Sequence, residues 1–178
     1  MRKIVMIAAA VAAIFAAPYV AAQDFLPRYS VTGSYTAVLD GSAMRFFVTD
    51  DTGENTRGAE AHEILGKVFI NIVGRTDDGS GTPAAPVLAL QLGPDAPPPT
   101  RLSEITLLID GMILTAMTDI GGSAEATNVV YGAGGQLSFD FTGTLIEVSR
   151  ADDGALSPVS GGVQRQISGS FAGIVPVQ

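Results

Sequence analysis

QLSFDFTGTLIEVS, residues 136–149, is the stretch that decides the fold class. Large apolar residues and polar residues alternate along it, and the apolar set is Leu137, Phe139, Phe141 and Leu145. Successive side chains of a β-strand point to opposite faces, so this pattern predicts a strand with one buried and one solvated face. After Leu145 the alternation slips. That slip indicates either a bulge or a strand that passes from one sheet to another.

Shorter alternating runs of the same kind recur along the chain and are separated by turns that contain glycine. The clearest hairpin is centred on Asp110-Gly111, and a second is centred on Asp40-Gly41. Asp-Gly supplies the positive φ angles that a two-residue type I′ turn requires. We expect an all-β, antiparallel fold of about nine short strands, arranged as a β-sandwich, with a small closed β-barrel as the alternative.

A five-residue pattern of apolar, hydroxyl, glycine, hydroxyl and apolar residues occurs three times, at 31–35, 141–145 and 167–171. Strand alternation places each glycine on the inner face and the hydroxyl groups on the outer face. An inward glycine lets a strand bend or makes room for an aromatic ring from the next strand. The alternative is that the three glycines line a groove for a ligand: Gly33, Gly143 and Gly169.

The first and last copies of this pattern lie near the two ends of the chain. Their similarity predicts terminal strands in equivalent or neighbouring positions, which would close the sheet. In the alternative arrangement the two strands form open edges that pair between molecules, and the protein is a subunit of a fibre or surface layer.

Residues 1–22 have the pattern of an export signal. A basic start, Arg2-Lys3, precedes an uncharged apolar stretch, and the segment ends in small residues at 20–22. Signal peptides share these three parts. We therefore expect a mature chain of residues 23–178 that works in the periplasm, at the cell surface or outside the cell. An uncleaved membrane anchor is the alternative, because residues 4–22 could just span a bilayer.

Residues 23–178 are predicted to form a single domain, because their number lies within the usual size of one hydrophobic core. The proline-rich segment 93–100 is the natural place for a boundary, since proline has no amide hydrogen to give to a sheet. The pieces on either side would each be small cores without disulfides. We therefore expect the segment to be a crossover between two sheets of one domain.

The chain has no cysteine, 18 acidic residues and ten Lys and Arg residues, for a formal net charge of −8. The lack of cysteine excludes disulfides, thiolate metal sites, cysteine nucleophiles and a lipidated cysteine at the cleavage site. The acidic balance and the lack of a basic stripe argue against nucleic acid as a partner. No transmembrane segment is expected once the signal has been removed.

Pairs of aspartates precede glycine at three predicted turns. Aspartate and glycine favour tight turns for backbone reasons, and this is the preferred interpretation. Oxygen-rich turns also suit calcium, although no EF-hand spacing is present. Calcium is the one cofactor that the sequence suggests, and its candidate ligands are Asp50, Asp51, Asp77, Asp78, Asp152 and Asp153.

No motif identifies a catalytic residue. His62 is the only histidine, and the residues after it do not complete a zinc-protease pattern. Carboxylates for sugar hydrolysis would have to be brought together by the fold, and the candidates are Asp119, Glu125, Asp140 and Glu147. We expect an exported, non-catalytic interaction module or surface-assembly subunit at the cell envelope, whose partner is a protein or an envelope component. The alternative is a hydrolase of an envelope polymer that uses carboxylates or His62.

Overall fold

The computed structural model describes residues 24–96 and 99–176 of the 178-residue chain. The predicted export signal, residues 1–22, lies outside the described residues. In the described ranges the chain forms eleven β-strands and two short 3-10 helices, and every strand pair is antiparallel, which confirms the all-β, antiparallel fold class. None of the helices in these ranges is long and apolar enough to cross a membrane.

The strands are β1 (Tyr29–Leu39), β2 (Ser42–Asp51), β3 (Ala59–Ile64), β4 (Lys67–Asp77), β5 (Pro83–Asp95), β6 (Leu102–Ile109), β7 (Met112–Thr115), β8 (Ser123–Tyr131), β9 (Gln136–Arg150), β10 (Leu156–Pro158) and β11 (Gln164–Ile174). The helices are η1 (Thr118–Ile120) and η2 (Ala133–Gly135). The prediction of about nine strands missed two short ones, β3 and β10.

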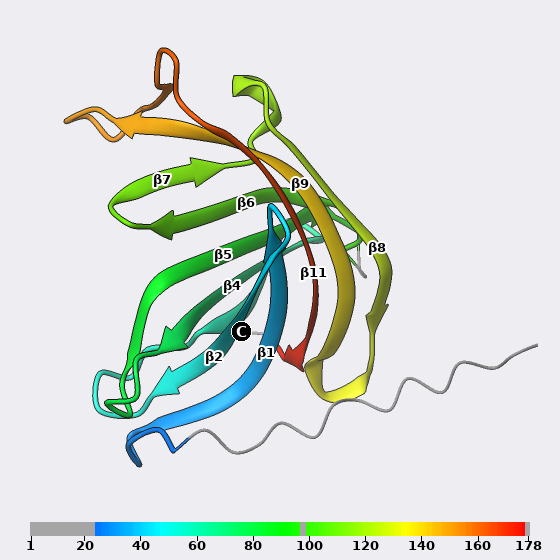
Figure 1. Cartoon of the computed structure of the whole chain (residues 1–178). Helices are drawn as coiled ribbons and strands as arrows, with labels where there is room; N and C mark the ends of the chain where they lie inside the picture. Colours follow the sequence, from blue (N-terminus) through cyan, green and yellow to red (C-terminus); the bar gives the residue numbers. More distant parts are fainter. Residues whose placement is uncertain (1–23, 97–98, 177–178) are drawn as a thin grey trace, which may run out of the picture.

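One sheet contains all eleven strands. Its hydrogen-bonded order is β10-β9-β11-β1-β2-β4-β5-β6-β7, with β3 paired to β4 and β8 paired to β9 beside this path. β7 also pairs with β9, so the path of neighbours from β9 to β7 closes on itself. In Figure 1 the strands β9, β11 and β1 lie across β4, β5, β6 and β7. The sheet therefore folds into two facing layers with the core between them, as in the layered packing of a sandwich.

The two layers are joined by short pairings. β2 and β4 share two residue pairs, and β7 and β9 share three, whereas β9 and β11 share eleven. β9 joins the layers because it changes partner along one edge: it pairs with β8 as far as Thr144 and with β7 from Ile146. The slip of the pattern after Leu145 therefore coincides with this change of partner within one sheet, and not with a crossing between two sheets.

The first and last strands are neighbours. β1 pairs with β11 from Gly33–Gly173 to Leu39–Ile167, and each of these two strands also pairs on its other edge, β1 with β2 and β11 with β9. The prediction that the terminal strands close the sheet is confirmed. The alternative, in which these two strands are open edges that join molecules, is wrong because their hydrogen-bonding groups are used within the chain.

Both predicted Asp-Gly hairpins are present. Asp40 and Gly41 have φ angles of 47° and 88° between β1 and β2, and Asp110 and Gly111 have φ angles of 51° and 78° between β6 and β7. Positive φ at both central residues is the requirement of a type I′ turn, whose twist matches that of the flanking strands.

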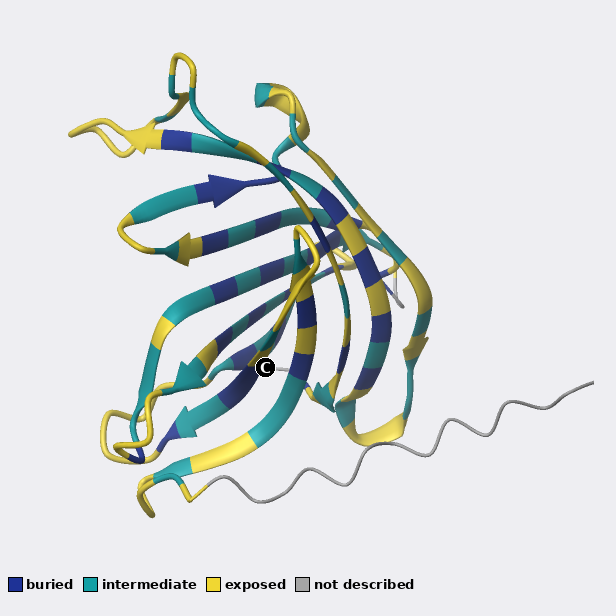
Figure 2. Ribbon diagram, viewed as in Figure 1, coloured by how far each residue is buried: buried dark blue, intermediate teal, exposed yellow. Residues whose placement is uncertain are grey.

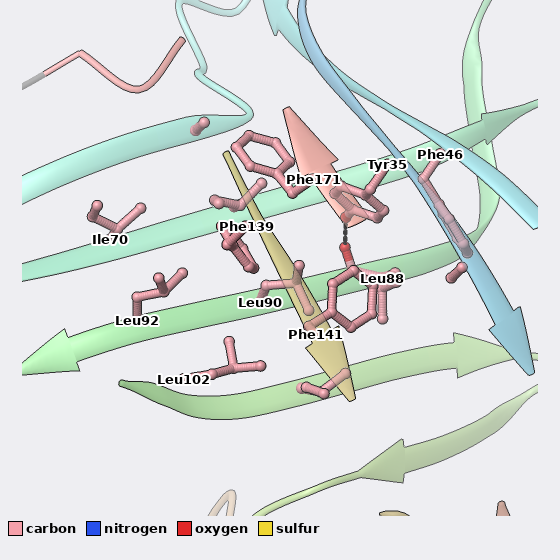
Figure 3. Packing of buried hydrophobic residues seen from close by; sticks show 14 of the residues in the cluster. Tyr35, Phe46, Ile70, Leu88, Leu90, Leu92, Leu102, Phe139, Phe141 and Phe171 are labelled. Atoms are coloured by element: carbon pink, nitrogen blue, oxygen red, sulfur yellow. Dashed lines mark hydrogen bonds between the residues drawn. The ribbon is translucent and has the colours of Figure 1, made fainter. Parts of the chain in front are cut away.

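Aromatic rings form the centre of the core. Phe139, Phe171 and Tyr35 are directly opposite one another on β9, β11 and β1, and the ring centroids are 5.4 Å apart for Phe139–Phe171 and 6.0 Å apart for Phe171–Tyr35. Phe141 packs edge-on against Tyr35. Figure 3 shows these rings above Leu88 and Leu90 of β5, in the facing layer.

Tyr35 links the two layers with its polar end. Its hydroxyl donates a hydrogen bond to the carbonyl of Leu88, the dashed line in Figure 3. Gly74 of β4 makes room for this hydroxyl, because a Cβ atom at Gly74 would lie 2.3 Å from it. Burial raises the pKa of Tyr35 well above its ordinary value, because the low-polarity core disfavours the phenolate.

The segment before β1 covers part of the outside of the sheet. Phe47 follows the core residue Phe46 on β2 and therefore points outward, yet only 3% of it is exposed. The ring of Phe25 packs edge-on against it with the centroids 5.4 Å apart, and the guanidinium of Arg45 lies 5.0 Å from the Phe47 ring. The amide of Leu26 donates to the carbonyl of Gly81, which fixes this segment to the β4–β5 connection.

The prediction of a crossover at residues 93–100 is wrong in two respects. β5 continues through Pro94 to Asp95, which pairs with Val68 of β4. The following connection leads to β6, the direct antiparallel neighbour of β5, and therefore does not cross between layers. Proline is accepted here because the β4–β5 register shifts at this end of the ladder, and irregular positions do not need its missing amide hydrogen.

Candidate functional site

The hydroxyl groups of the three repeated patterns lie on the outer face of β1, β11 and β9. These strands are consecutive neighbours in the sheet. Figure 2 shows buried and more exposed residues in alternation along β1 and β9. The pattern residues Thr32, Ser34, Thr142, Thr144, Ser168 and Ser170 are all exposed or half-buried. The result is an outer face that presents hydroxyl groups from three adjacent strands.

The three glycines of these patterns do not lie in one row. Gly33 is opposite Gly173, Gly169 is opposite Phe141 and Ala37, and Gly143 is opposite Ile167. Core atoms fill the space beside them: an added Cβ would lie 3.2 Å from Phe171 at Gly33, 2.6 Å from Phe141 at Gly169 and 2.8 Å from Ile105 at Gly143. The glycines therefore make room for neighbouring side chains on the inner face.

A groove crosses the outer face of the same strands. Its volume is about 540 Å³, and its outward-facing lining consists mainly of small polar side chains with one carboxylate: Ser34, Thr36, Ser138, Asp140, Ser170 and Asn128, together with Ala172. Hydroxyl and amide groups can both donate and accept hydrogen bonds, and a carboxylate accepts them. The groove therefore offers a ligand several hydrogen-bonding partners on a surface that is otherwise mainly apolar.

A bulge in β8 forms one wall of this groove. The β8–β9 register shifts between Thr127 and Val130, and Asn128 has a φ angle of 54°. Asparagine is one of the few residues that adopt this left-handed conformation readily. The side-chain amide of Asn128 donates to Asp140 with an N–O distance of 2.7 Å. The bulge thus places an amide and a carboxylate side by side at the edge of the hydroxyl-lined floor.

The groove has a rigid support. Directly beneath its floor, on the inner face of the same strands, lies the row of rings formed by Phe139, Phe171 and Tyr35. These rings are at most 2% exposed. Interior packing of this density holds the buried side chains in single conformations, so the strands that carry the hydroxyl groups have a well-ordered backbone.

The acidic turns use their carboxylates to hold their own backbone. Asp51 accepts hydrogen bonds from the amides of Gly53 and Glu54, and Asp50 accepts one from the amide of Gly58. The same arrangement recurs for Asp77 with Gly79, Asp78 with Ser80 and Asp153 with Ala155. This is the turn chemistry expected of aspartate. The hydrogen bonds from Ser80 lower the pKa of Asp78 below its ordinary value.

The structure does not bring the candidate calcium ligands into one cluster. Within residues 24–96 and 99–176, no three acidic or histidine side chains are grouped closely enough to hold a metal ion. Asp152 and Asp153 lie in the turn between β9 and β10, whereas Asp50 and Asp51 end β2 and Asp77 ends β4. Calcium binding at any of these turns stays a prediction.

Two of the four candidate catalytic carboxylates share a face. Glu125 of β8 is opposite Thr142, and Asp140 of β9 is opposite Thr127, so both project from the outer face of neighbouring strands. Glu147 accepts a hydrogen bond from the amide of Val163, and Asp119 lies in η1.

His62 lies on β3 with its Nε2 atom 3.5 Å from Glu60. In the described part of the chain, no serine or threonine hydroxyl is hydrogen-bonded to His62. A catalytic role for His62 or for these carboxylates stays a prediction.

Sequence reasoning missed the wall of the groove. The stretch around Asn128 continues a strand-like pattern, and the only local signal of the bulge is an asparagine inside that pattern. It also missed a pocket at the other end of β1, where Arg28, Arg57 and Arg75 come together. These arginines are far apart in the sequence, and no local pattern connects them.

Comparison with known proteins adds no further assignment: no protein-family model, curated protein or solved structure matches the chain.

Proposed function

We propose that this protein is exported to the cell envelope or beyond and acts there as a non-catalytic binding module, with the outer face of β1, β11 and β9 as its binding surface. The export signal pattern at residues 1–22 supports the location. The groove on the outer face supports the binding role. The partner is an envelope component rich in hydrogen-bonding groups.

The observation that carries this proposal is a groove that presents hydrogen-bonding side chains from strands backed by a packed core. Ser34, Ser138 and Ser170 line a groove of about 540 Å³, and the buried rings beneath it hold the backbone of these strands in place. Preorganised polar groups lose little conformational entropy when a ligand binds. Volumes of this size are typical of sites for small ligands or for short segments of a polymer.

A substitution in the groove tests the binding surface. Ser170→Arg places a long charged side chain across the floor of the groove, and Ser170 is exposed, so the fold is expected to tolerate it. Gln164→Arg is the matched control: it lies on the same strand, is also exposed, and is outside the groove. We expect the protein to co-sediment with an envelope fraction, Ser170→Arg to lose this association and Gln164→Arg to keep it. Equal association of both variants would refute the groove as the binding surface.

The location has its own test. Mass spectrometry of the protein recovered from a secretory host should give a chain that begins at Gln23, since the signal pattern ends at Ala22. Recovery of the full-length chain in a membrane fraction would instead support the uncleaved anchor.

If copies of the protein assembled by pairing strands between molecules, they would have to use strands other than β1 and β11. In the described ranges β8 pairs only with β9, so its other edge is not hydrogen-bonded to a strand. The bulge at Asn128 interrupts that edge, and such interruptions are a common protection against edge-to-edge pairing. We therefore expect a monomer by light scattering at high concentration. Ordered polymers in electron micrographs would support the surface-assembly alternative.

The hydrolase alternative has its own discriminating variants. Asp140 is the carboxylate that lines the groove, and His62 is the only histidine. A substrate panel of envelope polymers, tested with the unmodified protein, Asp140→Ala and His62→Ala, distinguishes the two functions. Hydrolysis that either variant abolishes would replace the binding module with an enzyme.

A further inference from the structure

A second polar pocket, separate from the groove, lies beside the connection between β2 and β3. Its volume is about 410 Å³, and it shares no lining residue with the groove. Arg28, Arg57 and Arg75 all line it. The whole chain has only ten Lys and Arg residues and a net charge of −8, so three arginines in one pocket are a marked local concentration of positive charge.

The connection that carries Arg57 is held firmly by hydrogen bonds. Asp51 and Thr56 exchange two backbone hydrogen bonds of 2.9 and 3.1 Å, and the amide of Thr52 donates to the carbonyl of Arg28. At the end of the connection, Gly58 donates to the Asp50 carboxylate and accepts a hydrogen bond from the amide of Val73. Asp50 and Asp51, which the sequence suggests as calcium ligands, therefore hold the backbone that surrounds this pocket.

Two of the three guanidinium groups are available to a ligand. Arg28 is already engaged: it stacks on the Tyr29 ring at 4.6 Å, donates to the Tyr29 hydroxyl and lies 3.7 Å from the Asp51 carboxylate. Among the described residues, Arg57 and Arg75 have no carboxylate within ion-pair distance and no side-chain hydrogen bond. Both are exposed, and both line the pocket.

The acidic residues of the pocket do not cancel this charge. Asp51 is 9% exposed, one of its oxygens accepts hydrogen bonds from two backbone amides, and the other faces Arg28. Glu54 remains as the single carboxylate against the guanidinium groups of Arg57 and Arg75. The lining also includes the hydroxyl groups of Thr49 and Thr56. The pocket therefore combines net positive charge with neutral donors and with one acceptor.

We propose that this pocket binds an oxyanion, a phosphate or a carboxylate group, carried by a hydroxylated ligand of about the size of a sugar. Guanidinium groups match the planar, two-point geometry of these anions and form hydrogen bonds about twice as strong as neutral ones. The carboxylate of Glu54 accepts a hydrogen bond from a ligand hydroxyl, which a bare anion lacks. The volume suits one such residue of a ligand.

Titration calorimetry of the purified protein at low salt tests the proposal with three sugars of similar size. Glucose 1-phosphate carries a phosphate, glucuronate carries a carboxylate, and glucose carries no charge. We expect at least one of the two anions to bind, glucose not to bind, and the affinity for the anion to fall as salt is added. The anion that binds more tightly identifies the group on the natural ligand. Equal affinity for glucose and both anions, or no binding of either anion, would overturn the proposal.

Three arginine variants locate the binding. Arg57→Gln and Arg75→Gln should each weaken binding of the anion by about tenfold or more, since each removes a charge-assisted hydrogen bond. Arg150→Gln is the matched control, because Arg150 is an exposed arginine at the end of β9, outside the pocket. An equal loss in Arg150→Gln would show non-specific attraction and refute the site. Ser170→Arg should leave anion binding unchanged, so failure of this site and failure of the groove are separate results.

Discussion

The hydroxyl of Tyr35 on β1 donates a hydrogen bond to the carbonyl of Leu88 on β5, across the core and between the two layers of the sheet. It is a polar link inside an otherwise apolar cluster, and only 1% of Tyr35 is exposed. Its position at the centre of the aromatic row makes it sensitive to changes in both layers. Tyr35→Phe removes this hydroxyl, and Gly74→Ala changes its surroundings.

Tyr35→Phe should lower the free energy of unfolding by about 1 kcal/mol, the usual net value of a buried hydrogen bond.

Tyr35→Phe should also change how the free energy of unfolding depends on pH in alkali. The pKa of Tyr35 is raised by burial, so the folded protein keeps this contribution below the ordinary pKa of 10.0 and loses it as the pH rises further. Urea unfolding between pH 8 and about 11 measures both effects. Tyr131→Phe, which removes a hydroxyl from a half-buried tyrosine on β8, is the matched control.

Gly74→Ala should destabilise the fold by about 1–3 kcal/mol, the usual cost of overpacking a core. The new Cβ would lie 2.3 Å from the Tyr35 hydroxyl oxygen and 3.0 Å from the Phe46 Cβ. Removal of the hydroxyl relieves part of this conflict. The double variant with Tyr35→Phe should therefore lose less stability than the sum of the two single variants, which a double-mutant cycle measures. Strict additivity would contradict the contact.

Gly169→Ala tests whether the glycines of the repeated pattern are needed to make room for neighbouring side chains. Its control measures the effect of a lost glycine where space is not limiting. Its Cβ would lie 2.2 Å from the carbonyl oxygen of Thr36 and 2.6 Å from Phe141, and the backbone cannot yield cheaply. We expect a loss of about 2 kcal/mol or more in urea unfolding. Gly132→Ala is the control, because its φ is −107° and its nearest neighbour would be 3.7 Å away. That variant should be neutral or slightly stabilising. Similar losses in both variants would contradict the packing argument.

The ion pair between Asp40 and Arg165 should make stability fall in acid. Arg165 Nη1 lies 2.8 Å from Asp40 Oδ2, and the hydrogen bond from Arg165 lowers the pKa of Asp40 below its ordinary value of 3.8. Stability from this pair is present above that value and is lost as the pH falls through the lower, folded pKa. Asp40→Asn keeps a residue suited to the turn but should flatten this acid response in thermal melts. Asp110→Asn, the same substitution in the matching turn between β6 and β7, is the control.

Calcium should not raise the melting temperature. The carboxylates of the acidic turns already accept hydrogen bonds from backbone amides of their own turns, and these bonds compete with coordination of a cation. A ligand that binds only the folded state would stabilise it in proportion to its concentration. Melts in millimolar calcium and in chelator should therefore coincide. A rise with calcium that the chelator reverses would restore the calcium hypothesis.

The sequence predicted those parts of the fold that depend on local patterns. Alternation around Phe139 and Phe141 indicated the longest strand and its buried face, and Asp-Gly pairs located two hairpins. The pattern could not show that Phe47 is buried on the outer face, because Phe25 covers it from another segment.

Other features follow from pairings between distant parts of the chain. Closure of the sheet depends on β7, a strand of four residues, whose pairing with β9 has no signal in either strand. The groove and the arginine pocket are assembled in the same way. Arg57 and Arg75 come together through the pairing of strands, and Asn128 becomes a wall only because the β8–β9 register shifts there. The prediction that Pro94 lies outside the sheet was wrong, because a strand tolerates proline at a position where its register shifts.

The pairing of β1 with β11 has a consequence for the timing of folding. Residue 33 of the first strand is opposite residue 173 of the last, so this part of the ladder forms only after nearly the whole chain has been synthesised. Contacts between such distant residues form late, because the intervening chain must first be ordered. A nascent chain that lacks β11 leaves one edge of β1 and one edge of β9 unpaired, and its aromatic core lacks Phe171. Such a chain stays unfolded for longer, which would favour the export proposed above, because translocation channels pass unfolded chains.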